Sequence, residues 1–249
     1  MSNQEELIRL ASEIKNCQKC PLYKAATNPV PGAPNPNAEI VFVGEAPGYW
    51  EDQKGIPFVG AAGNLLDKLL AKISVKRDDV FVCNILKHRP PNNRAPMPDE
   101  ITACTPFLKR QLLTIKPKVV ITLGRFAMNY FIPEAYISQT HGHPMSVNWE
   151  GLDLLIIPMY HPAAALRNGQ VMKQLEEDFL KVPEIIEPRG LNLRYQSKRS
   201  VGAKILNQKT NSSTEKAHGF LGSRIKTNGQ LVVKPAPPPE PEIEQGKLF

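Results

Sequence analysis

Cysteine and histidine side chains form the first group able to do chemistry. Cys17 and Cys20 stand in a Cys-x-x-Cys-Pro segment, and Cys104 follows far downstream. This spacing suits a zinc site, a redox pair or an iron–sulfur cluster, and two buried structural cysteines are the alternative without a metal. The remaining cysteine is Cys83. We expect no disulfides in a reducing compartment, so all the thiols are free to bind metal or to pack in the core.

A glycine-rich acidic segment is the second group. It reads Gly44-Glu-Ala-Pro-Gly-Tyr-Trp-Glu-Asp and follows an apolar run. Glycines let a backbone approach a ligand and expose amide donors, and Glu45 and Glu51 supply carboxylates where a catalyst would be placed. A tight turn alone would explain the glycines, but it explains the whole segment poorly.

Two polar positions close later apolar runs. Asn84 precedes Lys-His-Arg-Pro-Pro-Asn-Asn-Arg, which begins at Lys87. An asparagine amide carries a donor and an acceptor together and can match a nucleobase edge. Arg89 and Arg94 could hold phosphates, although arginines on a proline-rich loop are often only solvated. His161 could donate to a carbonyl that gains negative charge, or be a satisfied core group.

Short apolar runs alternate with helical patterns over the first 183 residues. Residues 39–43, 80–85, 119–123 and 154–159 read as buried strands, because they are short, branched and bounded by Gly, Pro or Asn. Residues 63–73 read as a helix, and from Pro98 onward apolar residues recur every three or four positions as far as Ile115. The pattern predicts an α/β fold with a mostly parallel sheet of about four strands, whose carboxyl ends bind ligands.

Charge and composition divide the chain near Arg189. We expect one domain over residues 1–188 and a disordered tail over residues 189–249, because the tail is poor in apolar residues and rich in proline at its end. Residues 189–235 hold ten Lys or Arg against one acid, out of a net charge of +7 for the whole chain. A basic tail favours a polyanionic partner. No stretch resembles a signal peptide or a membrane span, so we expect a cytoplasmic protein.

The order of these motifs resembles the iron–sulfur uracil-DNA glycosylases, the fourth family of that superfamily. The resemblance also rests on Gly55-Ile-Pro-Phe-Val-Gly and Cys104-Thr-Pro-Phe-Leu, and it covers about residues 10 to 183. It implies a three-layer α/β/α sandwich and a structural [4Fe–4S] cluster. It also implies hydrolysis of the N-glycosidic bond of a flipped deoxyuridine, in single- or double-stranded DNA, to leave an abasic site.

The resemblance implies a role for each matching residue. Phe58 would stack on the flipped uracil, and Asn84 would donate to O4 and accept from N3. His161 would bind O2 of the leaving base, helped by backbone amides around Gly44, Glu45 and Ala46. Either Glu45 or Glu51 would orient the water or steady the positive sugar. The loop after His161 would fill the hole left by the base, with Leu166 as the wedge beside Arg167.

One position departs from the family pattern. His88 stands where the third cysteine ligand of the cluster is usual. Either His88 or Cys83 would complete a set with Cys17, Cys20 and Cys104. We favour His88, because it keeps the register and Cys83 would point the opposite way from Asn84 along a strand.

The last five residues resemble a bacterial sliding-clamp-binding peptide, in which Gln245 fills a side pocket and Leu248 and Phe249 fill a groove. We expect a monomer that acts on uracil-containing DNA. A uracil-trapping relative is disfavoured, because the basic insertion it needs is absent between Arg94 and Cys104. A non-catalytic polymerase-accessory protein would not need Glu45, Phe58, Asn84 and His161 together, and a zinc-stabilised scaffold would be colourless.

Overall fold

A computed structural model describes residues 1–191 of the 249-residue chain. The predicted tail, including the clamp-binding residues Gln245, Leu248 and Phe249, lies outside the described residues from position 192 onward. Leu191 is 2% exposed and packs in the core, so the folded region extends at least to that residue. No helix within residues 1–191 has both the length and the apolar character needed to cross a membrane.

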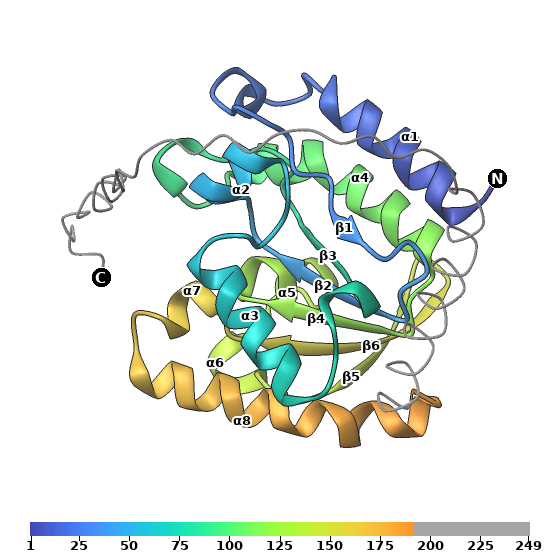
Figure 1. The fold of residues 1–249 in the computed structure, drawn as a ribbon, viewed down its shortest axis with the longest axis vertical. Helices are drawn as coiled ribbons and strands as arrows, with labels where there is room; N and C mark the ends of the chain where they lie inside the picture. The colour runs from blue at the N-terminus through green and yellow to red at the C-terminus, as the bar shows by residue number, and fades with distance from the viewer. Residues whose placement is uncertain (192–249) are drawn as a thin grey trace, which may run out of the picture. The chain divides into compact units, whose positions relative to one another are not determined.

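A six-stranded mixed sheet forms the centre of the described chain (Figure 1). Its spatial order is β1-β3-β2-β4-β6-β5, in which β3, β2, β4 and β6 run parallel and the two edge strands run antiparallel. The strands are β1 (Ala33–Pro34), β2 (Ile40–Gly44), β3 (Phe81–Asn84), β4 (Val119–Leu123), β5 (Met145–Trp149) and β6 (Leu152–Met159).

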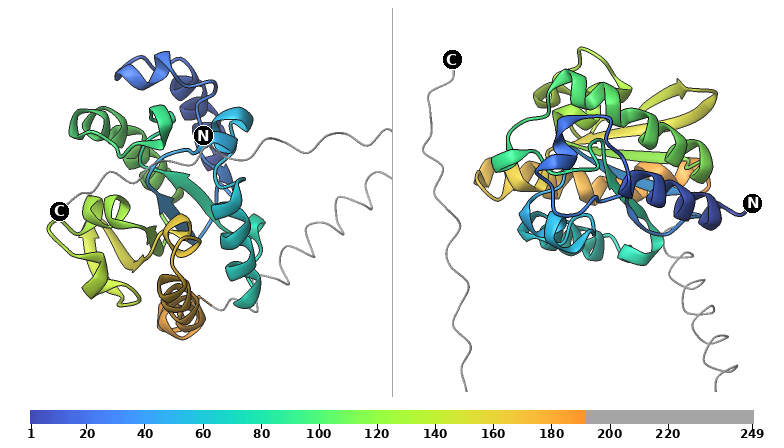
Figure 2. Two further views of the ribbon diagram at one scale, coloured as in Figure 1. Left: turned by 90° about the vertical axis from the view of Figure 1, so that its left-hand side faces the viewer. Right: turned by 90° about the horizontal axis from the view of Figure 1, so that it is seen from above.

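Helices cover both faces of this sheet, so the three-layer prediction is confirmed (Figures 1 and 2). The helices are α1 (Asn3–Lys15), α2 (Tyr49–Lys54), α3 (Ala61–Lys72), α4 (Pro98–Ile115), α5 (Arg125–Phe131), α6 (Ile137–Thr140), α7 (Pro162–Ala165) and α8 (Gly169–Ile186). Helical turns of the 3-10 type occur at Pro21–Lys24, Arg77–Asp79, Pro91–Asn93 and Glu187–Arg189.

Two hydrophobic clusters separate the layers, because successive strand residues point to opposite faces. One cluster joins Phe42 and Ile121 of the sheet to α3 and α8, and Phe42 stacks on Phe179. The other joins Val41 and Val120 to α1, α4 and α5. The central strands are buried on both faces, which explains their uninterrupted apolar sequences.

The four predicted strands are all present and form the parallel centre of the sheet, but the estimate of about four strands omitted the two edges. Strand β1 has only two residues, and β5 alternates exposed with half-buried positions. Neither edge strand carries the apolar run that identified the central ones. Helix α3 spans Ala61–Lys72, close to the predicted residues 63–73, and α4 starts at the predicted Pro98.

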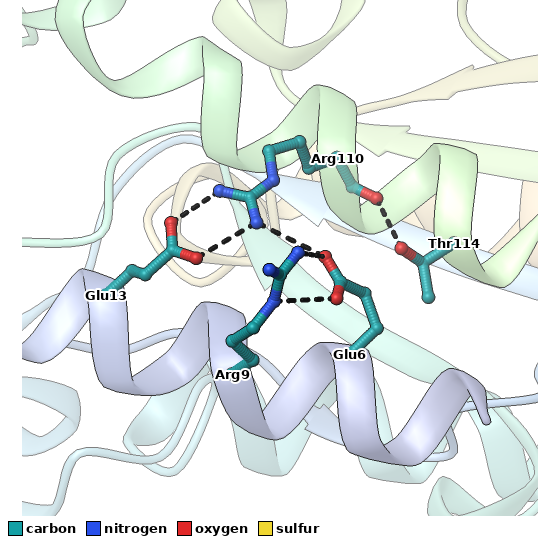
Figure 3. Close-up of polar contacts among 5 residues, drawn as sticks. All are labelled: Glu6, Arg9, Glu13, Arg110 and Thr114. Atoms are coloured by element: carbon teal, nitrogen blue, oxygen red, sulfur yellow. Dashed lines mark hydrogen bonds and ion pairs between the residues drawn. The ribbon is translucent and has the colours of Figure 1, made fainter. Parts of the chain in front are cut away.

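Charged side chains fasten α1 to α4 (Figure 3). Arg110 of α4 forms ion pairs with Glu6 and Glu13, which lie on one side of α1, and Arg9 shares Glu6. Buried Leu10 and Ile14 of α1 pack in the cluster that includes α4. The end of α1, from which Cys17 and Cys20 follow, is thus held beside the helix that carries Cys104.

Candidate active site

The predicted site residues converge where the central strands end. Gly44 closes β2, Asn84 closes β3, Gly124 follows β4, and His161 follows β6 after Tyr160. The chain leaves β2 for β3 on one side, whereas β4 lies on the other. This is a topological switch point, the place at which parallel α/β sheets bind ligands.

The absence of a side chain at Gly44 lets two other residues approach. A Cβ atom there would lie 2.4 Å from Asn84 Oδ1 and 2.7 Å from Phe58 Cζ, which are both far closer than real contacts. Asn84 is 1% exposed, and its Oδ1 has no hydrogen-bond partner among the described residues. An unpaired buried polar atom is costly, so a ligand donor is the natural partner for this oxygen.

The Phe58 ring is held by an unusual backbone and a buried carboxylate. Phe58 has a φ of 52°, which is rare outside glycine. Glu51 Oε1 accepts hydrogen bonds from the amides of Val59 and Gly60, both at 2.9 Å. Arg77 donates to the carbonyl of Pro57 at 2.6 Å. Glu51 therefore orders the loop of residues 57–60, which carries Phe58 and is called the aromatic loop below.

His161 contacts a backbone amide and the Phe58 ring. The Ala163 amide donates to His161 Nδ1 at 3.1 Å, which places the proton of the neutral ring on Nε2. Burial lowers the pKa of His161 to about 4, against an opposing effect of Glu51. The ring stacks on Phe58 with centroids 5.7 Å apart, and a Cβ at Gly124 would lie 3.2 Å from His161 Cβ.

Glu45 differs from Glu51 in its surroundings. Burial raises the pKa of the Glu45 carboxyl, and Arg125 partly offsets the shift. No backbone amide among the described residues donates to Glu45, whereas Glu51 receives two. The two glutamates are therefore not equivalent, which their positions in the sequence could not reveal.

Lys87 is a residue whose role the sequence did not predict. It is 1% exposed, and its ammonium donates at 2.7 Å both to the carbonyl of Asn84 and to Gln111 Oε1. Its own amide donates to Cys104 Sγ at 3.2 Å, and Gln111 donates to the carbonyl of Pro31. A lysine is rarely buried unless it is paired, but no sequence pattern distinguished this one from the surface lysines.

The cysteine candidates come from three segments that meet at the end of α1. Cys17 and His88 line one hollow of about 260 Å³. Burial raises the pKa of Cys104 to about 11, and the nearby Cys20 and Cys17 thiols add to the shift. Within residues 1–191, no three Cys, His, Asp or Glu side chains stand close enough together to hold a metal ion as they lie. The donor types suit a cluster, since a metal would replace the thiol protons.

Cys83 and His88 have different neighbours. Cys83 is fully buried on β3, where a Cβ at Gly32 would stand 3.1 Å from it. Burial raises the pKa of Cys83, and only Lys87 opposes that shift. His88 is 6% exposed, and burial lowers its pKa so that the neutral imidazole is favoured. His88 alone of the two shares a hollow with Cys17.

The predicted DNA-contact residues lie in distinct settings. Leu166 is 48% exposed at the end of α7, next to the exposed Arg167. Arg89 is half-buried and donates to Asn93. Arg94 instead forms a two-pronged pair with the buried Glu100, at 2.6 and 2.9 Å. That pair closes the loop before α4, so its guanidinium is already engaged.

Comparison with known proteins agrees with this geometry. The profile of the Uracil DNA glycosylase superfamily matches residues 31–182. A type-4 uracil-DNA glycosylase of Saccharolobus solfataricus is 46% identical over 195 residues, which are 76% of this chain and 90% of that protein. Those of Archaeoglobus fulgidus and Thermotoga maritima are 47% and 42% identical and are covered over 94% and 100% of their lengths, by 73% and 76% of this chain.

The chain belongs to the type-4 uracil-DNA glycosylases. The family predicted from the order of the motifs is thus confirmed, and so is the uracil-DNA glycosylase fold class. The matched region begins before the cis peptide between Ala33 and Pro34 and ends within α8, so it contains every strand of the sheet.

The buried ammonium of Lys87 gives a prediction on stability. Lys87→Met would leave the Asn84 carbonyl and Gln111 Oε1 buried without a donor, at about 1–3 kcal/mol for each group. We expect a fall in the free energy of unfolding of that size, measured by urea denaturation. Lys109→Met, which removes an exposed pair with Glu150, is the control and should change it by less than about 1 kcal/mol. Equal effects of the two changes would contradict the role assigned to Lys87.

Proposed function

We propose that this protein is a monofunctional uracil-DNA glycosylase, which hydrolyses the bond between uracil and deoxyribose in DNA and leaves an abasic site. The observation that carries the proposal is the buried Asn84 Oδ1, which lacks a partner beside the Phe58 ring at the switch point of the sheet. A base buried this deeply must leave the DNA stack first.

Base recognition would rest on Asn84 and Phe58. The uracil ring would stack on Phe58, with its N3 proton donated to Asn84 Oδ1 and its O4 accepting from Nδ2. Cytosine would place an amine against Nδ2 and would lack the N3 proton. Two buried polar groups would then be unmatched, at about 1–3 kcal/mol each. In the structure, Oδ1 is the atom of the Asn84 amide that lacks a partner, so it is free to accept the N3 proton.

Departure of the base would depend on His161. As the bond between C1′ and N1 breaks, both electrons leave with the uracil, and negative charge gathers on O2. His161 Nε2–H would donate to that oxygen, since Nδ1 already accepts from Ala163. The low pKa keeps this imidazole neutral near pH 7. Backbone amides around Glu45 and Ala46 would add to the stabilisation.

Glu45 would place the attacking water. Water oxygen bonds to C1′ and gives its proton to a carboxylate, and a carboxylate of raised pKa is the stronger base. Glu45 has such a pKa, whereas Oε1 of Glu51 already accepts hydrogen bonds from the Val59 and Gly60 amides. We therefore assign the water to Glu45 and the ordering of the aromatic loop to Glu51.

DNA would lie across the carboxyl edge of the sheet. Leu166 is exposed enough to enter the gap left by the base, and Arg167 and Arg89 would face phosphates. Arg94 would act by shaping its loop with Glu100. The basic residues beyond position 189 would add salt-sensitive affinity, and Gln245, Leu248 and Phe249 would recruit a sliding clamp.

A [4Fe–4S] cluster would be held by Cys17, Cys20, Cys104 and His88. Its contribution would be structural, as a cross-link between the segment after α1, the loop after β3 and α4. The hollow shared by Cys17 and His88 supports His88 over Cys83 as the fourth ligand. The Lys87 amide would stabilise the Cys104 thiolate, as outer-shell donors commonly do for metal ligands.

The activity is tested with a labelled oligonucleotide that bears one uracil, treated with alkali to cut abasic sites. We expect excision by the wild type and a loss of about 10- to 100-fold for Asn84→Ala, from one to two unmade buried hydrogen bonds. Thr122→Val is the matched control, because it removes the other unpartnered buried polar atom of the described chain and should leave excision unchanged. A wild-type protein with its iron content verified that leaves uracil in place would end the proposal.

The assignment of Glu45 predicts a pH dependence. A base must be deprotonated, so kcat/KM should fall as the pH drops through the raised pKa of Glu45, above the ordinary value of 4.5. His161 should add no step near 6.5, because its pKa is about 4. Glu45→Gln should lower the rate and flatten the acidic limb, measured under single-turnover conditions. A limb that survives Glu45→Gln unchanged would contradict the assignment.

The fourth ligand is tested by iron analysis and visible absorption. We expect His88→Cys and Cys83→Ser to keep the cluster, and Cys104→Ser to lose it. Cys83→Ser serves as the control for Cys104→Ser, because it also removes a buried thiol. Loss of iron in Cys83→Ser, with iron retained in His88→Ala, would assign the ligand to Cys83 instead.

A further inference from the structure

Two large aromatic side chains stand exposed beside the proposed uracil pocket. Tyr49 is 49% exposed and Trp50 is 43% exposed, both on α2. The role assigned to Glu51 accounts for the carboxylate that follows them, but it leaves these rings unexplained. Single exposed apolar residues are common on protein surfaces, so what distinguishes these two is their grouping.

The rings and one guanidinium form a compact group. Tyr49 and Trp50 have centroids 5.2 Å apart and planes at 79°, so one ring meets the other by its edge. The guanidinium of Arg89 lies 5.2 Å from the centre of the Tyr49 ring. Arg89 is held there by Asn93, whose Oδ1 accepts from its Nε at 2.7 Å. The group therefore joins α2 to the loop after β3.

This group lies directly next to the pocket. A Cβ at Gly60 would stand 3.4 Å from Trp50 Cδ1 and 3.4 Å from Glu51 Oε1. Gly60 is two residues from Phe58, on the loop that Glu51 orders. A nucleotide joined to the flipped uridine would thus leave the pocket close to the indole.

We propose that Tyr49, Trp50 and Arg89 form a stacking platform for the unpaired base next to the flipped uridine. The inference rests on the proposed function and extends it to a second nucleotide. Exposed aromatic faces bind bases of any sequence, and the arginine adds attraction for the adjoining phosphate. Because the rings stand nearly perpendicular, one flat base cannot stack on both, and the platform takes one base.

The platform favours single-stranded DNA. In a duplex the neighbouring base is already stacked and paired, and it would have to leave that stack to reach Trp50. In a single strand the base is free, and each stacked base is worth about 5- to 160-fold in affinity. The protein should therefore gain more from the platform on single strands than on duplexes.

Binding is tested without any excision, by using single-stranded oligonucleotides that lack uracil. The chain has two tryptophans, Trp50 and Trp149, so full-length Trp149→Phe protein reports on Trp50 alone. We expect quenching of its fluorescence on addition of the oligonucleotide. Adding Tyr49→Ala should weaken binding by about 5-fold or more with an unchanged salt dependence, whereas Arg89→Ala should reduce the slope of log affinity against log salt by about 0.7. Leu180→Ala, which removes an exposed apolar side chain from α8, is the control and should change neither.

The contact with the neighbouring base is tested by excision. We compare a uracil flanked by normal bases with one flanked by a stable abasic analogue, on the 5′ or the 3′ side. For the wild type, one of the two analogues should lower kcat/KM about 5- to 160-fold on single strands. Trp50→Ala should lose a similar factor on the normal substrate and nothing more on that analogue, while Trp50→Phe should recover part of the loss.

The outcomes separate the platform from the proposed function. Absence of quenching, or losses from Trp50→Ala and the analogue that multiply, would overturn the platform while excision itself persists. Absence of excision from every substrate, with quenching intact, would overturn the glycosylase proposal and leave a base-stacking surface.

Discussion

The close approach of three chain segments at Gly44 is the constraint on which the candidate site depends. Asn84 Oδ1 and the Phe58 ring both occupy space that any side chain at this position would fill. Gly44 is paired with Asn84 in the register of β2 and β3, so the sheet itself fixes the first contact. The second contact needs a loop with positive φ at Phe58. Glu51 orders this loop by accepting a hydrogen bond from the Val59 amide. A rigid sheet edge and a loop ordered by the Glu51 carboxylate together hold the Asn84 amide beside the Phe58 ring. This arrangement suits a flat ring that brings a donor to the unpartnered Asn84 Oδ1.

Lys87 links Asn84 of the candidate site to Cys104 of the cysteine group. Its ammonium binds the Asn84 carbonyl, and its amide binds Cys104 Sγ, so one residue contacts both regions. The ion pairs of Arg110 hold α1 against α4 on the same side of the sheet. A structural cluster there would stiffen the loop that runs from Asn84 to His88. This gives a physical reason for a cluster in an enzyme whose proposed chemistry needs no electron transfer. The rigidity of the Asn84 side chain would then depend on the segment that follows it.

Much of the fold and the family could be predicted from the sequence, because buried parallel strands and motif order leave strong local signals. Residues 119–123 were predicted to be a strand and are β4, whereas β5 was missed because an edge strand alternates weakly. The positions of Asn84 and His161 at strand ends were predictable from chain order. The different surroundings of Glu45 and Glu51 were not predictable, since they depend on which backbone amides donate to each carboxylate. The pairing of Arg94 with Glu100 and the burial of Lys87 are likewise products of tertiary packing.

Environment separates the chemical roles of groups that lie close together. Burial lowers the pKa of His161 and raises that of Glu45, because in each case it disfavours the charged form. A neutral imidazole can donate a hydrogen bond to an oxygen that gains negative charge as the base leaves, and it carries no net charge that would attract DNA phosphates. A desolvated carboxylate binds a proton more readily than one in water, so it can take the proton of an attacking water. Arg125 opposes the effect of burial on the pKa of Glu45 and so favours its charged form. In the proposed mechanism, the same edge of the sheet would therefore supply a donor for the leaving base and an acceptor for the proton of the water.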